Sequence, residues 1–333
     1  MQPGYSLPPH LPASYTDPAR PWATALFLGY ALALAFLPGV LSYLLLAGIP
    51  SAWPWTVLPV ALLSTIAGFG FYVIGTTAHE GFHFNLGRSK WTSAVLGTWV
   101  SAAIIGFFGV GFYLVHSQHH RYTNQEQDPD YQLFSRFRRT WHRLLVLRMV
   151  NNRTYVKIVA ALLSRSQLPD GVRTVFSLDE LKMLARINVV AQLFWISCYI
   201  AMLIINPLLA LCCVLLPHLA TAVVSATIVF VQHADTGHAL SDNARTHSSP
   251  LVTLLMGGTN YHLEHHLYPR VPCWRLAGLH RWLCKSAWAQ QNPLMVEKKF
   301  WRGFLLCRER FPYGRRVQQA QMHVTDVNAM VDG

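Results

Sequence analysis

Charged side chains are scarce in this chain of 333 residues, at 13% of the sequence against roughly 25% in an average soluble domain. Hydrophobic residues make up 52%, so the composition argues against a soluble globular protein and favours a membrane protein. The net charge of +12 does not indicate a nucleic-acid partner, because the basic residues flank long apolar runs and no nucleic-acid-binding motif accompanies them. Attraction to anionic lipid headgroups explains them better.

Motifs that would hold an internal electron carrier are missing too. The six cysteines include no C-x-x-C pair, so the chain has no iron–sulfur pattern and its thiols suit a reducing compartment. Gly106, Gly109 and Gly111 follow no predicted strand and lack the βαβ context of a dinucleotide-binding loop. Redox chemistry would therefore take its electrons from a separate protein.

Four apolar runs are long enough to cross the ~30 Å hydrocarbon core of a bilayer at ~1.5 Å per helical residue. They cover approximately residues 22–48, 56–78, 187–206 and 207–231. The short links inside each pair carry no Lys or Arg, so the positive-inside rule places the opposite side of the membrane, which bears the basic residues, in the cytoplasm. We expect an all-α integral membrane protein with four transmembrane helices in two hairpins.

The remaining segments are assigned by their composition. Residues 1–21 are proline-rich, which predicts an N-terminal tail. We expect residues 22–285 to form the membrane domain and residues 286–333 to form a basic C-terminal cytoplasmic tail. The stretch 91–115 is apolar enough for a further span. A complete crossing would separate the histidines on either side of it, so we expect a re-entrant or interfacial segment.

Eight of the 16 histidines fall into three closely spaced groups. Box one is His79 and His83, box two is His116, His119 and His120, and box three is His262, His265 and His266. Spacings of three and four residues put the rings of a box on one face of a helix. Eight histidines exceed the four ligands of a structural zinc and suit two metal ions with open positions. Imidazole binds zinc, copper, iron and nickel alike, so ligand type does not name the metal, although oxidation with oxygen would favour two irons.

The boxes also carry a resemblance to a known family. The motifs are His79-Glu-Gly-Phe-His83, His116-Ser-Gln-His119-His120 followed by Asp128-Pro-Asp130, and Asn260-Tyr-His262-Leu-Glu-His265-His266-Leu-Tyr-Pro269. With the paired apolar runs, the chain from about Trp22 to Leu279 resembles the membrane fatty acid desaturase/hydroxylase family. The resemblance implies a cytoplasmic helical cap that carries the boxes, two non-haem irons bound by the eight box histidines, and O2 as co-substrate.

The same resemblance implies a ninth ligand between the last span and box three. His233 is preferred by its position, with His238 as the competitor. Polar residues beside the boxes are candidates for orienting the ligand rings by hydrogen bonds. These candidates are Glu80, Asp128, Asp235, Asn260 and Glu264. No separate catalytic acid or base is assigned.

The activity that the resemblance implies is oxidation of an unactivated C–H bond in a fatty-acyl or similar long lipid chain. Desaturation is the main expectation; hydroxylation or ketolation, and oxidative decarboxylation to a terminal alkene, stay open. The expected partners are membrane lipids and an external electron donor, such as a ferredoxin or similar carrier with its reductase. A metal-binding membrane protein without catalysis is the alternative from another class.

Overall fold

The computed structural model describes residues 7–17, 20–48, 53–137, 139, 142, 144, 146–164, 167 and 173–300. Helices dominate these residues, as predicted, and the described strands are β1 (Thr246–His247) and β2 (Val296–Glu297), which pair in parallel. The chain divides into two compact units. Unit 1 comprises Met1–Pro18, Gln118–Arg138 and Val229–Gly333, and unit 2 comprises Ala19–Ser117 and Arg139–Ile228, as far as each is described.

Four helical segments are long and apolar enough to cross a membrane, and they overlap the four predicted spans. They are α2 (Pro21–Gly48), Pro54–Phe82 of α3 (Trp53–Phe82), α9 (Leu178–Ile205), and Pro207–His233, which contains α10 (Pro207–Ala210), the π-helical η2 (Leu211–Leu215) and α11 (Leu216–His233). Large apolar side chains on them are exposed, for example Leu58 (77%) and Ile205 (82%). Such exposure suits contact with lipid and identifies a membrane protein.

The third span begins at Leu178, earlier than the predicted residue 187. Ser177 accepts a hydrogen bond from the backbone N–H of Glu180, and the Glu180 carboxylate accepts one from the N–H of Ser177. This capping box satisfies two N–H groups at the helix start and so begins α9 inside a polar segment. The apolar run alone could not reveal that start.

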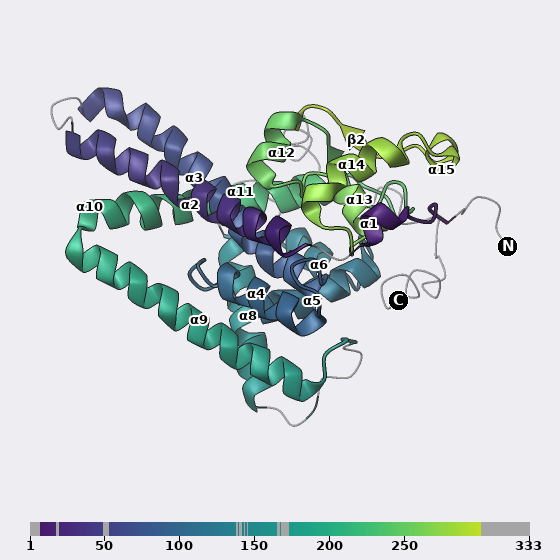
Figure 1. Ribbon diagram of the computed structural model, residues 1–333, viewed down its shortest axis with the longest axis horizontal. Helices are drawn as coiled ribbons and strands as arrows, with labels where there is room; N and C mark the ends of the chain where they lie inside the picture. Colours follow the sequence, from purple (N-terminus) through teal and green to yellow (C-terminus); the bar gives the residue numbers. More distant parts are fainter. Residues whose placement is uncertain are drawn as a thin grey trace. The chain divides into compact units, whose positions relative to one another are not determined.

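Within unit 2, α2 and α3 pack side by side, and α3 also packs on α4 (Lys90–Ser101) (Figure 1). Two glycines allow the close approach of these backbones. A Cβ on Gly70 would lie 2.2 Å from the backbone nitrogen of Ala35 in α2, and a Cβ on Gly97 would lie 2.4 Å from the carbonyl oxygen of Thr77 in α3. Small residues at helix contacts are typical of membrane proteins.

The apolar stretch 91–115 is not one continuous helix. It comprises α4, which ends at Ser101, a non-helical loop at 102–108, and the start of α5 (Gly109–Tyr122). With 12 residues, α4 is about 18 Å long and too short to cross a bilayer. The break agrees with the expectation that this stretch is no ordinary span; its depth in the membrane stays a prediction.

Polar side chains of the spans satisfy the backbone of loop 102–108. Tyr199 donates to the carbonyl of Ala103 at 2.7 Å, and His218 accepts from the N–H of Ile105 at 3.2 Å. Gln192 has four partners: its amide nitrogen donates to the carbonyls of Ala102, Ile104 and Phe107 at 3.0, 2.9 and 2.9 Å, and its oxygen accepts from the N–H of Gly106 at 3.2 Å. Because irregular backbone among apolar helices must find protein partners, Gln192 holds the loop that places α5.

The remaining described helices are short. They are α1 (Ala13–Thr16), α6 (Pro129–Ser135), α8 (Leu147–Ser164), α12 (Pro250–Met256), α13 (His262–Leu267), α14 (Cys273–Leu283) and α15 (Ala287–Gln291). The N-terminal tail is tied to unit 1, since Tyr268 donates to the carbonyl of Pro9 and Arg275 to that of Asp17. The predicted C-terminal tail includes α15 and β2, while its residues 301–333 lie outside the described part. The predicted domain boundaries stay predictions.

Replacing Gln192 by methionine should destabilise the protein without changing side-chain volume much. The N–H of Gly106 and the carbonyls of Ala102 and Phe107 would lose their partner, at about 1–3 kcal/mol for each unsatisfied group, whereas the carbonyl of Ile104 would keep the N–H of Phe107. We expect the midpoint of thermal unfolding in detergent to fall clearly. The matched control is Leu193→Ala, whose side chain is 60% exposed on the same helix. Equal midpoints for the two variants would contradict this role of Gln192.

Candidate metal centre

Box three lies on α13, a short helix whose start is fixed by the turn that precedes it. Gly257 and Gly258 have φ angles of 62° and 97°, a left-handed conformation that reverses the chain after α12. The buried amide of Asn260 then donates to the carbonyl of His247 at 2.7 Å and to the hydroxyl of Thr253 at 2.8 Å. These contacts hold the chain where α13 begins, so Asn260 positions box three through the backbone.

Four histidines of unit 1 converge on one point. They are His119 from α5, His233 from the end of α11, and His262 and His266 from α13, and one nitrogen of each lies within 4.8 Å of the others. We call them the four-histidine cluster. The Nε2 atom of His262 is 2.9 Å from Nε2 of His233 and 3.2 Å from Nε2 of His266. Three elements distant in sequence thus bring ring nitrogens nearly into contact.

Hydrogen bonds determine which nitrogen of these rings carries the proton. Nδ1 of His119 lies 3.0 Å from the carboxylate of Asp128. Nδ1 of His233 lies 3.3 Å from the carbonyl of Asn243, and Nδ1 of His266 lies 3.4 Å from the hydroxyl of Thr123. A carboxylate or a carbonyl only accepts, so the protons of His119 and His233 are on Nδ1. The Thr123 hydroxyl donates to the carbonyl of His119 at 2.9 Å, and its oxygen therefore accepts from His266.

A neutral ring with its proton on Nδ1 presents a lone pair at Nε2. The lone pairs of His233 and His266 both lie against Nε2 of His262, which carries at most one proton and can satisfy only one of them, so a cation between the rings would relieve the remaining repulsion. Nitrogens bound at about 2.1 Å to one metal ion, at right angles, would be about 3.0 Å apart. The separations of 2.9 and 3.2 Å match that value, so the residues present fit a bound metal ion.

The electrostatics around His119 favour positive charge. Burial, the largest single effect, acts to lower its pKa, but the charge of Asp128, its hydrogen bond to the ring and the charge of Asp130 together raise the pKa to about 9. Burial, together with the neighbouring rings of His120 and His262, holds the pKa of His266 well below its usual value. Burial raises the pKa of the Asp130 carboxyl to about 6. The cluster can therefore hold one added positive charge beside Asp128, as a proton or as a metal ion.

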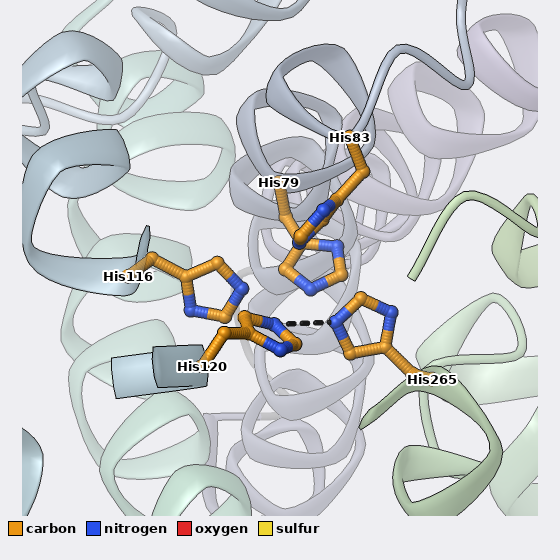
Figure 2. A group of neighbouring side chains, drawn as sticks. All are labelled: His79, His83, His116, His120 and His265. Atoms are coloured by element: carbon orange, nitrogen blue, oxygen red, sulfur yellow. Dashed lines mark hydrogen bonds between the residues drawn. The ribbon is translucent and has the colours of Figure 1, made fainter. Parts of the chain in front are cut away.

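The other box histidines form two further groups, one in each unit. In unit 1, Nε2 of His265 lies 2.9 Å from Nε2 of His120, the contact dashed in Figure 2. In unit 2, His79 of α3, His83 directly after the end of α3 and His116 of α5 point toward one another (Figure 2). Their ring centroids are 4.7 to 5.3 Å apart. All eight box histidines, and His233, thus have another histidine as neighbour.

The match to a family decides the identity of the chain. Residues 53–299 match the model of the family described as fatty acid desaturase. The chain belongs to the fatty acid desaturase family. None of the curated proteins compared with this desaturase-family chain matches it. The family and the histidine clusters together support an oxidoreductase of the membrane that binds metal.

Two of the predicted orienting residues contact a ring of a box histidine. Asp128 accepts from His119, and it is itself held by the N–H groups of Asn124 and Asp130 at 2.8 and 2.9 Å. Glu80 accepts from Nδ1 of His79 at 2.9 Å, and the amide of Asn85 donates to its other oxygen at 3.0 Å. A carboxylate bonded to the outer nitrogen of a ligand histidine fixes the ring and makes it a better ligand.

The other predicted orienting residues do not take that role. The Asp235 side chain is exposed at a turn with a φ of 55°, and none of the hydrogen bonds among the described residues joins it to a ring. Glu264 is fully buried but receives its hydrogen bonds from Thr246 and His280. It does not bond the ring of His262 or of His265, its neighbours in box three, because successive side chains on a helix point in different directions.

Sequence reasoning missed two residues that hold the four-histidine cluster. Asn124 has a φ of 63°, and its buried amide donates to Thr236, Gly237 and Asn243. It thereby joins the loop after α5 to the loop that carries the carbonyl for His233. An asparagine just after a histidine box is the signal that could have indicated Asn124. A backbone carbonyl such as that of Asn243 leaves no signal in the sequence.

We expect Asp128→Asn to lower the affinity for metal by about 10- to 100-fold, because the ring of His119 loses its anionic partner. Asp235→Asn is the matched control, since it makes the same change at an exposed position. Metal bound per chain after dialysis, measured by elemental analysis, separates the two. Equal metal content in both variants would show that the Asp128 contact is without effect.

His233 and His238 provide a second comparison. The structure brings His233 into the four-histidine cluster, and His238 is in none of the metal-ligand groups of the described residues. We therefore expect His233→Ala to lose bound metal and His238→Ala to keep it, both measured on folded protein with an unchanged elution volume. Retention of metal by His233→Ala would exclude it as a ligand.

Proposed function

We propose that this protein is an oxygen-dependent di-iron oxidase that removes hydrogen from an unactivated C–H bond of a fatty-acyl or similar long lipid chain. The observation that carries the proposal is the convergence of Nε2 lone pairs in the four-histidine cluster. Membership of the fatty acid desaturase family makes iron the metal that best fits this site. When bound, the iron pair would activate oxygen, which then accepts the electrons removed from the C–H bond.

The first iron would be held by His119, His233, His262 and His266, whose separations suit one ion. The remaining five box histidines would hold the second iron. Helix α5 supports this division, because His116 and His120 are one turn apart on one face while His119 belongs to the first ion. Asp128 and Glu80 would keep the outer protons on Nδ1 of His119 and His79, leaving Nε2 for the metal.

The membrane topology is part of the proposal. The spans α2 with α3, and α9 with α10–α11, would form two hairpins, with a re-entrant segment at α4 and loop 102–108. The links inside the pairs carry no basic residues, which favours a cytoplasmic position for the boxes and the helical cap around them. Electrons would come from an external ferredoxin-like carrier and its reductase.

Desaturation is the outcome that we propose first. Hydroxylation or ketolation, and oxidative decarboxylation of a fatty acid to a terminal alkene, would use the same ligands and differ in the position of the substrate chain. A non-catalytic metal-binding protein is less well supported, because ion transport would need ionisable side chains within the spans. The apolar windows of the four spans contain at most two acidic or basic residues each.

Product analysis tests the reaction directly. The protein would be expressed with a carrier and reductase, and cellular lipids analysed by mass spectrometry. A new double bond in a fatty-acyl chain supports desaturation, an added oxygen supports hydroxylation, and loss of one carbon supports decarboxylation. Purified protein that contains zinc or copper and consumes no oxygen would contradict the proposal as a whole.

His265→Ala should abolish turnover and lower bound iron, because one of the five proposed ligands of the second ion is lost. His142→Ala, a histidine outside the boxes, should change neither. Oxygen uptake and iron content are measured on both variants under the same conditions. Full turnover by His265→Ala would refute its assignment as a ligand.

A further inference from the structure

The geometry points to an anion-binding site at Arg148 that holds the carboxylate of an unesterified fatty acid, with the chain extending along an aromatic wall toward box two. This inference rests on the proposed function and names the substrate class. Arg148 is in the first turn of α8, and every residue of the argument lies in unit 2. It is not one of the box residues.

Arg148 is a half-buried cation without an acidic partner. None of the ion pairs among the described residues involves it, and its Nε atom is buried without a hydrogen bond there. Its guanidinium carbon lies 4.9 Å from the ring centre of Phe107. The ionisable groups that act on it are the hydroxyls of Tyr155 and Tyr72, which are neutral at pH 7. The described surroundings are therefore aromatic and supply no negative charge.

Such a site is incomplete without an anion. Removing a charged group from water is costly unless a counter-charge or hydrogen bonds replace the water. Burial, the largest effect, lowers the pKa of the guanidinium. A turn further along α8, Asn152 has an amide whose N–H groups could donate to the same anion; its amide oxygen is buried without a hydrogen bond in the described structure. A guanidinium binds a carboxylate through two parallel hydrogen bonds, which makes a carboxylate the suitable ligand.

A wall of aromatic rings connects this site to box two. Phe107 lies 5.7 Å from Phe112, and Phe112 stacks on His116 at 4.8 Å. Tyr155 contacts both phenylalanines edge-on, at 5.7 and 6.0 Å. An apolar chain anchored at Arg148 would meet rings continuously as far as a proposed iron ligand.

The same contacts give the length of this path. The steps from the guanidinium carbon to Phe107, from Phe107 to Phe112 and from Phe112 to His116 are 4.9, 5.7 and 4.8 Å, so the anion site lies up to about 15 Å from box two along the rings. A carboxylate held at Arg148 would therefore place a carbon well inside the chain, and not the carboxyl end, near the histidines. This favours desaturation or hydroxylation over decarboxylation.

The test compares palmitate with its methyl ester, which keeps the chain but has no charge. Binding to the full-length protein in lipid nanodiscs would be measured by titration calorimetry for wild type, Arg148→Gln, Arg148→Lys and Arg153→Gln. Arg153 is exposed on the same helix and is the matched control. We expect Arg148→Gln to weaken palmitate binding about tenfold or more and to leave the ester unchanged, Arg148→Lys to lie between, and Arg153→Gln to equal wild type.

Three results would overturn the inference. For Arg148→Gln, the first is unchanged palmitate binding, and the second is equal weakening for acid and ester. The third, from a parallel titration with lysophosphatidate, is weakening for that ligand alone, which would indicate a phospholipid headgroup. Iron content and oxygen uptake of the wild type are measured on the same preparation. A wild type that binds acid and ester equally, with iron and turnover intact, would contradict the Arg148 site alone, whereas absence of iron and of turnover from the wild type would contradict the proposed function.

Discussion

The structure of this site depends on where protons reside on imidazole rings. Carboxylate, carbonyl and hydroxyl acceptors take the Nδ1 protons of His119, His233 and His266, so that each of these rings presents its Nε2 lone pair. The lone pairs of His233 and His266 both lie against Nε2 of His262, which can satisfy only one of them, so a cation between the rings is favourable. The parts of unit 1 around the cluster, from the Asn124 hydrogen bonds to the glycine turn before α13, serve to hold these rings in place.

The ligands could be predicted because their spacing is local. Histidines at intervals of three and four residues share a helical face whatever the tertiary structure. Boxes two and three lie on α5 and α13, and box one lies at the end of α3, with His83 just beyond its last residue. Asp128 follows box two closely, and the structure brings it to His119. Asp235 and Glu264 are equally near a histidine in sequence, but a left-handed turn and the direction of a helical side chain point them elsewhere. Proximity in sequence does not determine which acceptor a ring meets.

The break in the apolar stretch 91–115 depends on contacts that no local pattern contains. A break in this stretch could be expected, because the boxes on either side of it must come together. The sequence did not indicate what stabilises loop 102–108. Gln192 and His218 are more than 80 residues away along the chain. They satisfy the backbone of that loop because, among apolar helices, water is not there to do so. Arg148 illustrates the opposite case, a polar group in aromatic surroundings that the described chain leaves without a counter-charge.

X-ray absorption at the iron edge of the purified, iron-loaded protein tests the central claim most directly. The account predicts two irons per chain, each with a nitrogen-rich shell at about 2.0–2.2 Å and the outer-shell scattering of imidazole rings. A shell made of carboxylate oxygens, a sulfur ligand, or a protein that takes up zinc in preference to iron would contradict it.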